Sequence, residues 1–273
     1  MKMKNIFSAS ALLLVLVLAV AGCGKKSSET ANEGQGTSPE ATASTAGGQK
    51  VDTSTAGSVS GMVAFDGAAP KPRKIDMSQD PACAKSGAAN TVETIATQDG
   101  KLANVYVYVK EGVGNYQFET PRDAVELDQE GCRYHPHVLA VMTGQQVKIL
   151  NSDPTTHNIH PTPKTNREWN ESQPPKGEPL TKEFAREEVM LPVKCNQHPW
   201  MKMYVNVSKH PYFAVTGSDG KFEIKNLPPG EYTLAAVHES LGEKTMKVKV
   251  DPKQDVKDQN FSFAAGGAAG GAQ

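Results

Sequence analysis

Residues with sulfur and nitrogen donor atoms gather in two short segments of the chain. Cys195, His198 and Met201 lie within seven residues of one another. His157 lies upstream, shortly after the expected strand 146–150. A thiolate, a thioether and imidazoles favour copper over magnesium or calcium, which prefer oxygen ligands. A mononuclear electron-transfer copper takes two imidazoles and one thiolate in a near-trigonal plane, with a weak axial methionine, so the spacing predicts a site for one copper ion.

The N-terminus has the features of an export signal. Lys2 and Lys4 precede a mostly apolar run over residues 6–20, which has signal-peptide length and is too short for a comfortable membrane span. The run ends in Val-Ala-Gly before Cys23 and so resembles a bacterial lipobox. That resemblance implies that residues 1–22 are removed and that Cys23 carries lipid. The alternative is an ordinary cleaved signal followed by a chance cysteine.

The residues after Cys23 bear on location and on order. Gly24 follows in place of aspartate, so the inner-membrane retention signal of some bacteria is missing. We therefore expect a lipid-anchored protein of the cell envelope, in the outer membrane and facing the periplasm or the exterior. Residues 23–56 contain hardly a large apolar side chain, which predicts a flexible linker, and the Gly/Ala-rich tail 264–273 is expected to be disordered.

The cysteine count bears on the metal site. Export places the chain where disulfides persist. The four cysteines are Cys23, Cys83, Cys132 and Cys195. Once Cys23 is lipidated, three remain, and an odd number leaves one thiol for another role. By elimination we expect a disulfide between Cys83 and Cys132. It would leave Cys195 free in an oxidising compartment, where a metal would protect it. This elimination argues against the plainer interpretation of Cys195 as a buried thiol beside a turn histidine.

Composition and strand pattern predict an all-β chain. The net charge of −1 provides no basic field, so no nucleic-acid partner is expected. Glycine and proline are plentiful, at 24 and 18 residues, and no long segment after the N-terminus repeats its apolar residues with helical period. Alternating or β-branched runs separated by glycine-containing turns favour β-sandwiches. The runs cover residues 59–65, 105–109, 137–142, 146–150, 189–193, 203–207, 221–224, 231–237 and 245–250.

Several residues of segment 125–208 occur in the order found in one known family. They are Tyr134-x-Pro136, Gly144, Asn151, Asp153, His157-Asn158 and Cys195-x-x-His198-Pro199-Trp200-Met201. In this order they resemble the cupredoxins, the blue-copper proteins, and the last motif is most similar to the ligand loop of amicyanins. The resemblance implies a Greek-key β-sandwich over residues 125–208 that binds one type 1 copper. The long polar segment 161–188 departs from the family pattern, and its role is open.

The cupredoxin resemblance implies a role for each residue of the site. His157 and His198 would be the imidazole ligands, Cys195 the thiolate and Met201 the axial ligand. Asn158 would connect the two ligand-bearing segments from outside the metal's own ligand set. Trp200 either packs in the fold or belongs to a docking patch near the second histidine, where cupredoxins pass electrons.

Met203 is the alternative axial ligand. Plastocyanin-like loops place a methionine five residues after the histidine, which is where Met203 stands. We prefer Met201, because the Pro-aromatic-Met order fits the shorter loop. Met203 begins the alternating run 203–207, so it is expected in the core.

Residues outside segment 125–208 resemble a second family. Asp219-Gly220-Lys221-Phe222 and the run from Leu227 to Leu234, with its Pro-Pro-Gly turn, resemble carboxypeptidase regulatory-like domains. The family's Gly-x-Val-x-Gly-x-Val opening strand fits residues 57–63. We therefore expect this second small sandwich to comprise residues 57–124 and 209–263, with the cupredoxin domain inserted; whether the two domains are nested in this way is left open. The resemblance implies a binding or scaffolding module.

Electron transfer is the expected function, with copper exchanging single electrons with an unidentified redox partner protein. An enzyme is not expected, because a catalytic type 1 domain needs a second copper site built from more histidines. His135, His137 and His160 are too few and too close in sequence for one, and their roles are open. The alternative is a copper-binding or delivery lipoprotein without electron transfer.

Overall fold

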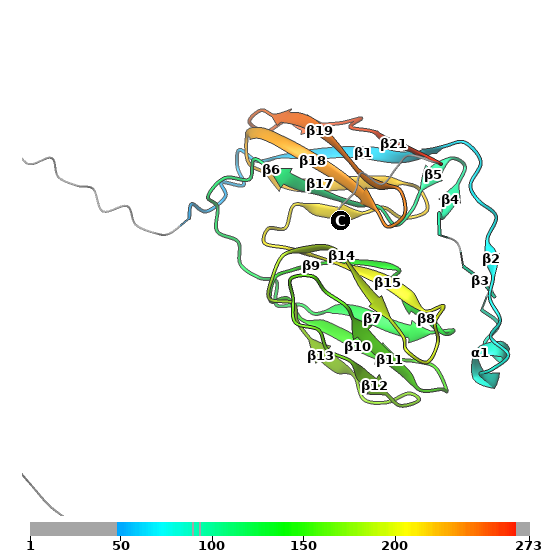
Figure 1. Ribbon diagram of the computed structural model, residues 1–273. Helices are drawn as coiled ribbons and strands as arrows, with labels where there is room; N and C mark the ends of the chain where they lie inside the picture. Colours follow the sequence, from blue (N-terminus) through cyan, green and yellow to red (C-terminus); the bar gives the residue numbers. More distant parts are fainter. Residues whose placement is uncertain (1–47, 89, 93, 266–273) are drawn as a thin grey trace, which may run out of the picture. The chain divides into compact units, whose positions relative to one another are not determined.

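The structure is a computed structural model that describes residues 48–88, 90–92 and 94–265 (Figure 1). The expected signal peptide 1–22, the lipidation residue Cys23 and most of the expected linker and tail lie outside the described residues. Among the residues that are described, no helix is long and apolar enough to cross a membrane.

The expected all-β fold with two β-sandwiches is confirmed. The first sandwich has one sheet in the order β17-β1-β5-β4, with β20 and β21 also pairing with β1, and a second sheet in the order β16-β6-β18-β19 (Figure 1). Its strands are β1 (Gly57–Asp66), β4 (Thr97–Gln98), β5 (Lys101–Leu102), β6 (Tyr106–Glu111), β16 (Phe213–Val215), β17 (Lys221–Leu227), β18 (Gly230–His238), β19 (Gly242–Val250), β20 (Asp255–Val256) and β21 (Phe261–Ala264).

Period-two patterning builds the core of this first sandwich. In β17 the side chains of Phe222 and Ile224 are buried while those between them face solvent, as expected for a strand with one buried face. They pack in one cluster with Val107 of β6 and Leu234 of β18, which come from the other sheet. Burial of these apolar faces against each other holds the two sheets together.

The second sandwich contains the residues expected to bind metal. Its sheets have the orders β13-β10-β7-β8 and β12-β11-β14-β15-β9. Pairing is parallel between β7 and β10 and between β9 and β15, and antiparallel elsewhere. The strands are β7 (Val125–Glu130), β8 (Arg133–His135), β9 (Val138–Met142), β10 (Val147–Asn151), β11 (His157–Pro161), β12 (Glu171–Gln173), β13 (Leu180–Lys182), β14 (Glu188–Lys194) and β15 (Lys202–Ser208).

The chain visits the sandwiches in the order first, second, first. It leaves the first sandwich after β6, builds β7 to β15 and returns at β16. The long polar segment 161–188 contributes the short strands β12 and β13 to the edges of the second sandwich.

A segment that precedes β6 nevertheless packs on the second sandwich. We call residues 73–88 the strap; it contains β2 (Arg73–Lys74) and the helix α1 (Pro81–Lys85), and β2 pairs with β3 (Thr91–Val92). Met77 and Cys83 of the strap are buried in the core of the second sandwich. The strap lies within the range 57–124 that the sequence assigned to the first sandwich.

A disulfide fixes the strap to the second sandwich. Cys83 in α1 is bonded to Cys132, as the elimination argument predicted, and Cys195 is free and buried. Cys132 lies in the tight turn between β7 and β8, where Gly131 and Cys132 have φ values of 61° and 54°. Positive φ at both central residues is the requirement of a type I′ hairpin turn.

Candidate metal centre

Strand pairing brings the expected ligands together. Cys195 directly follows β14, and His198 lies in the loop that leads to β15. Two backbone hydrogen bonds close this loop, from Met201 N–H to His198 O at 2.9 Å and from Cys195 N–H to Met201 O at 3.2 Å. His157 is the first residue of β11, which pairs with β14. The chain therefore positions His157 beside the loop through a neighbouring strand.

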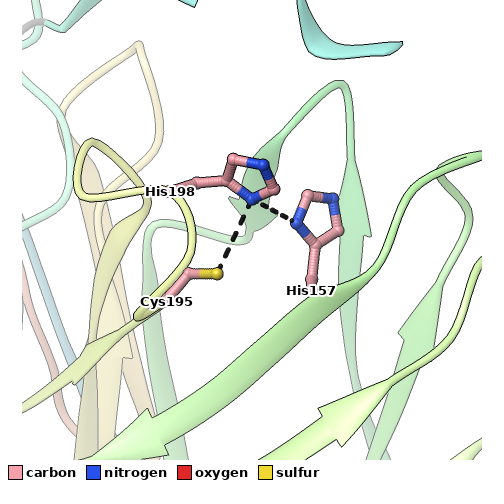
Figure 2. Close-up of side chains that lie close together, drawn as sticks. All are labelled: His157, Cys195 and His198. Atoms are coloured by element: carbon pink, nitrogen blue, oxygen red, sulfur yellow. Dashed lines mark hydrogen bonds between the residues drawn. The ribbon is translucent and has the colours of Figure 1, made fainter. Parts of the chain in front are cut away.

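The donor atoms of the three side chains converge (Figure 2). The Nδ1 atoms of His157 and His198 are 2.9 Å apart, and Cys195 Sγ is 3.7 Å from His198 Nδ1. One ligand atom from each residue lies within 4.8 Å of the other two. The residues are 0%, 2% and 4% exposed for His157, Cys195 and His198. This buried set of one thiol and two imidazoles could hold a metal ion.

Asn158 connects the two ligand-bearing segments. Its Oδ1 accepts a hydrogen bond from the backbone N–H of Asn196 at 2.7 Å and lies 3.2 Å from Cys195 Sγ. Its own backbone N–H lies 3.5 Å from Cys195 Sγ. Asn158, the residue after His157, therefore fixes the position of Cys195.

A carboxylate contacts His157 at Nε2, the ring nitrogen that faces away from His198. The Nε2 atom of His157 is 2.8 Å from Asp153 Oδ2. The backbone N–H groups of Gly131 and Cys132 donate to the two oxygens of Asp153, each at 2.8 Å. Metal-binding histidines are commonly held in this way, with the outer nitrogen donating to a carboxylate and the inner nitrogen facing the metal.

A second carboxylate, which the sequence analysis missed, contacts His198. The Nε2 atom of His198 is 3.0 Å from Oδ2 of Asp80, which lies on the strap, and 3.6 Å from Cys83 Sγ. The Trp200 ring packs against the same imidazole at 5.1 Å between centroids, and its Nε1–H donates to Cys132 O. The outer edge of His198 is therefore covered. No local signal in the sequence connects Asp80 with His198.

The surroundings shift the pKa values of Cys195 and His157. Burial by itself would raise the pKa of the Cys195 thiol, but its contacts with the rings of His157 and His198 and a hydrogen bond from the backbone N–H of Asn158 outweigh burial and lower the pKa to about 5. Burial would lower the pKa of His157, but Asp153 and Cys195 raise it to about 9. At neutral pH the metal-free site thus contains a thiolate beside an imidazolium. The thiolate is the form that binds metals.

The lowered pKa predicts a measurable titration in the metal-free protein. The ultraviolet absorbance of the Cys195 thiolate is expected to disappear on acidification with a midpoint at about pH 5. An ordinary cysteine would give a midpoint of about 8.5. Cys195→Ser is the control, because it removes this signal and leaves any other thiol in place. A midpoint near the ordinary value would contradict the charge pair described above.

Burial does not distinguish the two methionines. Met201 and Met203 are both 0% exposed and belong to the same apolar cluster. Met201 ends the loop between β14 and β15, whereas Met203 lies in β15 opposite Val193 of β14.

Three further histidines lie outside the buried group. The ring of His160 contacts Glu168 at 2.6 Å and Asn196 at 3.0 Å. His135 contacts the backbone oxygen of Glu130, and His137 Nε2 lies 3.0 Å from Glu239 Oε1. Among the described residues, none of the three belongs to a cluster that could hold a metal.

Comparison with known proteins gives partial similarities. The family model "ER membrane protein complex subunit 7, beta-sandwich domain" matches residues 193–268, which include β16 to β21 of the first sandwich. This part of the chain is similar to that β-sandwich domain. No curated protein gives a match.

Comparison with solved structures gives weak similarities to copper proteins. An oxidised amicyanin with a proline-to-alanine substitution is 20% identical, with 31% of this chain and 82% of that chain covered and a TM-score of 0.29. A purple cupredoxin from Nitrosopumilus maritimus is 24% identical, with 32% and 100% covered and a TM-score of 0.27. A copper-containing nitrite reductase from Thermus scotoductus SA-01 is 16% identical, with 54% and 28% covered and a TM-score of 0.29. Sequence identities of 24% or less do not identify a metal or an activity, so both are inferred from the geometry of the site.

Proposed function

We propose that this protein binds one copper ion between His157, Cys195 and His198 and transfers single electrons as a type 1 copper protein. The observation that carries the proposal is the convergence of two imidazole Nδ1 atoms and one sulfur atom in a buried group. Thiolate with imidazole is the donor set that copper electron-transfer sites use. Bound copper would supply a one-electron couple between Cu(I) and Cu(II).

The protein's own residues would keep the donor atoms in place in both oxidation states. Asp153 holds the ring of His157, and the Asn158 backbone N–H donates to the sulfur of Cys195, so neither donor can turn away without losing a hydrogen bond. A site that moves little between oxidation states favours fast electron exchange. Met201 would be the weak axial ligand, which tunes the potential.

Copper analysis with optical and electrochemical measurements tests this proposal. The purified full chain, loaded with Cu(II) and desalted, is expected to retain one copper per chain. It should have an intense thiolate-to-copper charge-transfer band in the visible range and a reversible one-electron couple. One bound copper without a reversible couple would favour the alternative function, copper storage or delivery. No retained copper would contradict both functions.

We also propose that the protein is an electron carrier, not an enzyme, and that it works at a membrane with an unidentified redox partner protein. The support for the location is the lipobox-like sequence before Cys23. Cys23→Ala is expected to move the protein out of the membrane fraction, or to leave an uncleaved precursor there, because no lipid can be attached. Fractionation of cells that express each form, with detection by immunoblot and mass, is the measurement. Unmodified wild-type protein in the soluble fraction would contradict the anchor.

A further inference from the structure

His198 Nε2, the ring nitrogen that faces away from Cys195, contacts a residue far away in the sequence. Asp80 lies 118 residues before His198, on the strap. Its Oδ2 is 3.0 Å from His198 Nε2, and the two side chains are 20% and 5% exposed. The contact is therefore well shielded from water, where such a pair has more effect than at an open surface.

Both oxygens of Asp80 are fixed by several partners. Oδ1 accepts hydrogen bonds from the backbone N–H groups of Ala82 and Cys83, which makes Asp80 the N-cap of α1. Oδ2 accepts a hydrogen bond from the Thr155 hydroxyl at 2.8 Å in addition to its contact with His198. Thr155 belongs to the loop that leads to His157, so Asp80 contacts both ligand-bearing segments.

The disulfide joins the supports of the two histidines. Cys83 follows Asp80 by three residues and is bonded to Cys132. The backbone N–H of Cys132 donates to Asp153 Oδ2, the oxygen that contacts His157 Nε2. Asp80, which contacts His198, and Asp153, which contacts His157, therefore each accept a hydrogen bond from one of the two cysteines of this disulfide.

We propose that Asp80 is a positioning residue of the metal centre: it accepts the Nε2–H of His198, so that Nδ1 stays free of a proton and faces His157 and Cys195. A neutral imidazole carries one N–H, and a carboxylate can only accept, so the proton is favoured on Nε2. The lone pair of Nδ1 then faces the other donor atoms. The copper part of this inference rests on the proposed function, whereas the tautomer part concerns the metal-free protein.

Asp80→Asn gives the sharpest test. Asparagine caps a helix as well as aspartate, so its oxygen is expected to keep the N–H groups of Ala82 and Cys83. Its NH₂ group then faces His198 Nε2 and can only donate. The proton of His198 is therefore expected to move to Nδ1, the nitrogen needed for the metal. Replacing a histidine-bound aspartate by asparagine is known to impose the wrong tautomer in serine proteases.

Two variants of the full chain control for structural effects. Asp80→Ser keeps a capping side chain but is too short to reach His198, so the tautomer preference should be lost rather than inverted. Asp76→Asn changes a carboxylate of the same strap that accepts from the Ser78 backbone, so it should behave like the wild type. Matching thermal unfolding of the four proteins verifies that the strap remains folded.

The first measurement uses metal-free protein labelled with ¹⁵N in the histidine rings. In the wild type and in Asp76→Asn, the ¹⁵N shifts of His198 are expected to show a protonated Nε2 and an unprotonated Nδ1. In Asp80→Asn the two shifts should exchange. The second measurement is competition for copper with a chelator, where Asp80→Asn is expected to bind ~10–100-fold more weakly, the usual effect of removing a partner behind a metal-binding histidine.

Each outcome has a definite meaning. If Nε2 stays protonated in Asp80→Asn and Asp80→Ser and copper affinity is unchanged, the loop itself orients His198 and the inference is wrong. If the tautomer changes as expected but the wild type retains no copper, Asp80 positions His198 and the proposed copper function is wrong. A tautomer change together with weaker copper binding supports both.

Discussion

Cys195→Ser is expected to abolish the thiolate-to-copper band and to lower copper retention sharply. Cys195 contributes the soft thiolate of the buried group, with a pKa of about 5 that keeps it ionised at neutral pH. A serine hydroxyl stays protonated and is a poor ligand for copper. The change is nearly isosteric, and the new hydroxyl can donate to Asn158 Oδ1, which lies 3.2 Å from Cys195 Sγ. The fold should therefore survive.

The measurement is the visible spectrum together with the copper content after desalting. His160→Gln is a matched control, because this imidazole lies near the site on β11 but contacts Glu168 and Asn196 instead of the buried group. The control should keep the band, whereas His157→Gln should damage it because the trigonal plane needs both imidazoles. A band that persists in Cys195→Ser would show that the assignment of the site is wrong.

Met201 and Met203 are expected to respond oppositely to substitution. Met201→Gln should keep copper bound while it shifts the colour and the reduction potential, because an axial thioether tunes a type 1 copper more than it holds it. Met203→Ala should leave the spectrum nearly intact. It should lower the free energy of unfolding by ~2–5 kcal/mol, since the side chain is fully buried in β15 and its loss leaves a cavity.

Denaturant unfolding of the metal-free proteins and spectra of the copper-loaded proteins separate the two effects. Each variant serves as the other's control, because both remove a methionine that is 0% exposed. The reverse result, with Met203→Ala changing the spectrum and Met201→Gln silent, would assign the axial position to Met203. The longer plastocyanin-like loop would then be the better comparison.

The local features of this protein could be predicted from its sequence. Alternating apolar residues define strands such as β17 and β15 because the faces of a strand repeat every two residues. Cys195 and His198 come together because only two residues separate them in a closed loop. The Cys83–Cys132 disulfide followed by elimination, once Cys23 was assigned to lipid and Cys195 to the metal.

Only the tertiary structure determined which carboxylates contact the outward-facing nitrogens of the two histidines. Asp80 reaches His198 across 118 residues through the strap, and Asp153 is held by backbone N–H groups of a hairpin turn 21 and 22 residues earlier. Such contacts leave no periodic or spaced pattern, because their geometry depends on how separate elements pack and not on neighbouring residues. The sequence by itself determined the donor atoms, whereas the packing of the strap and of the hairpin turn determined how those atoms are oriented.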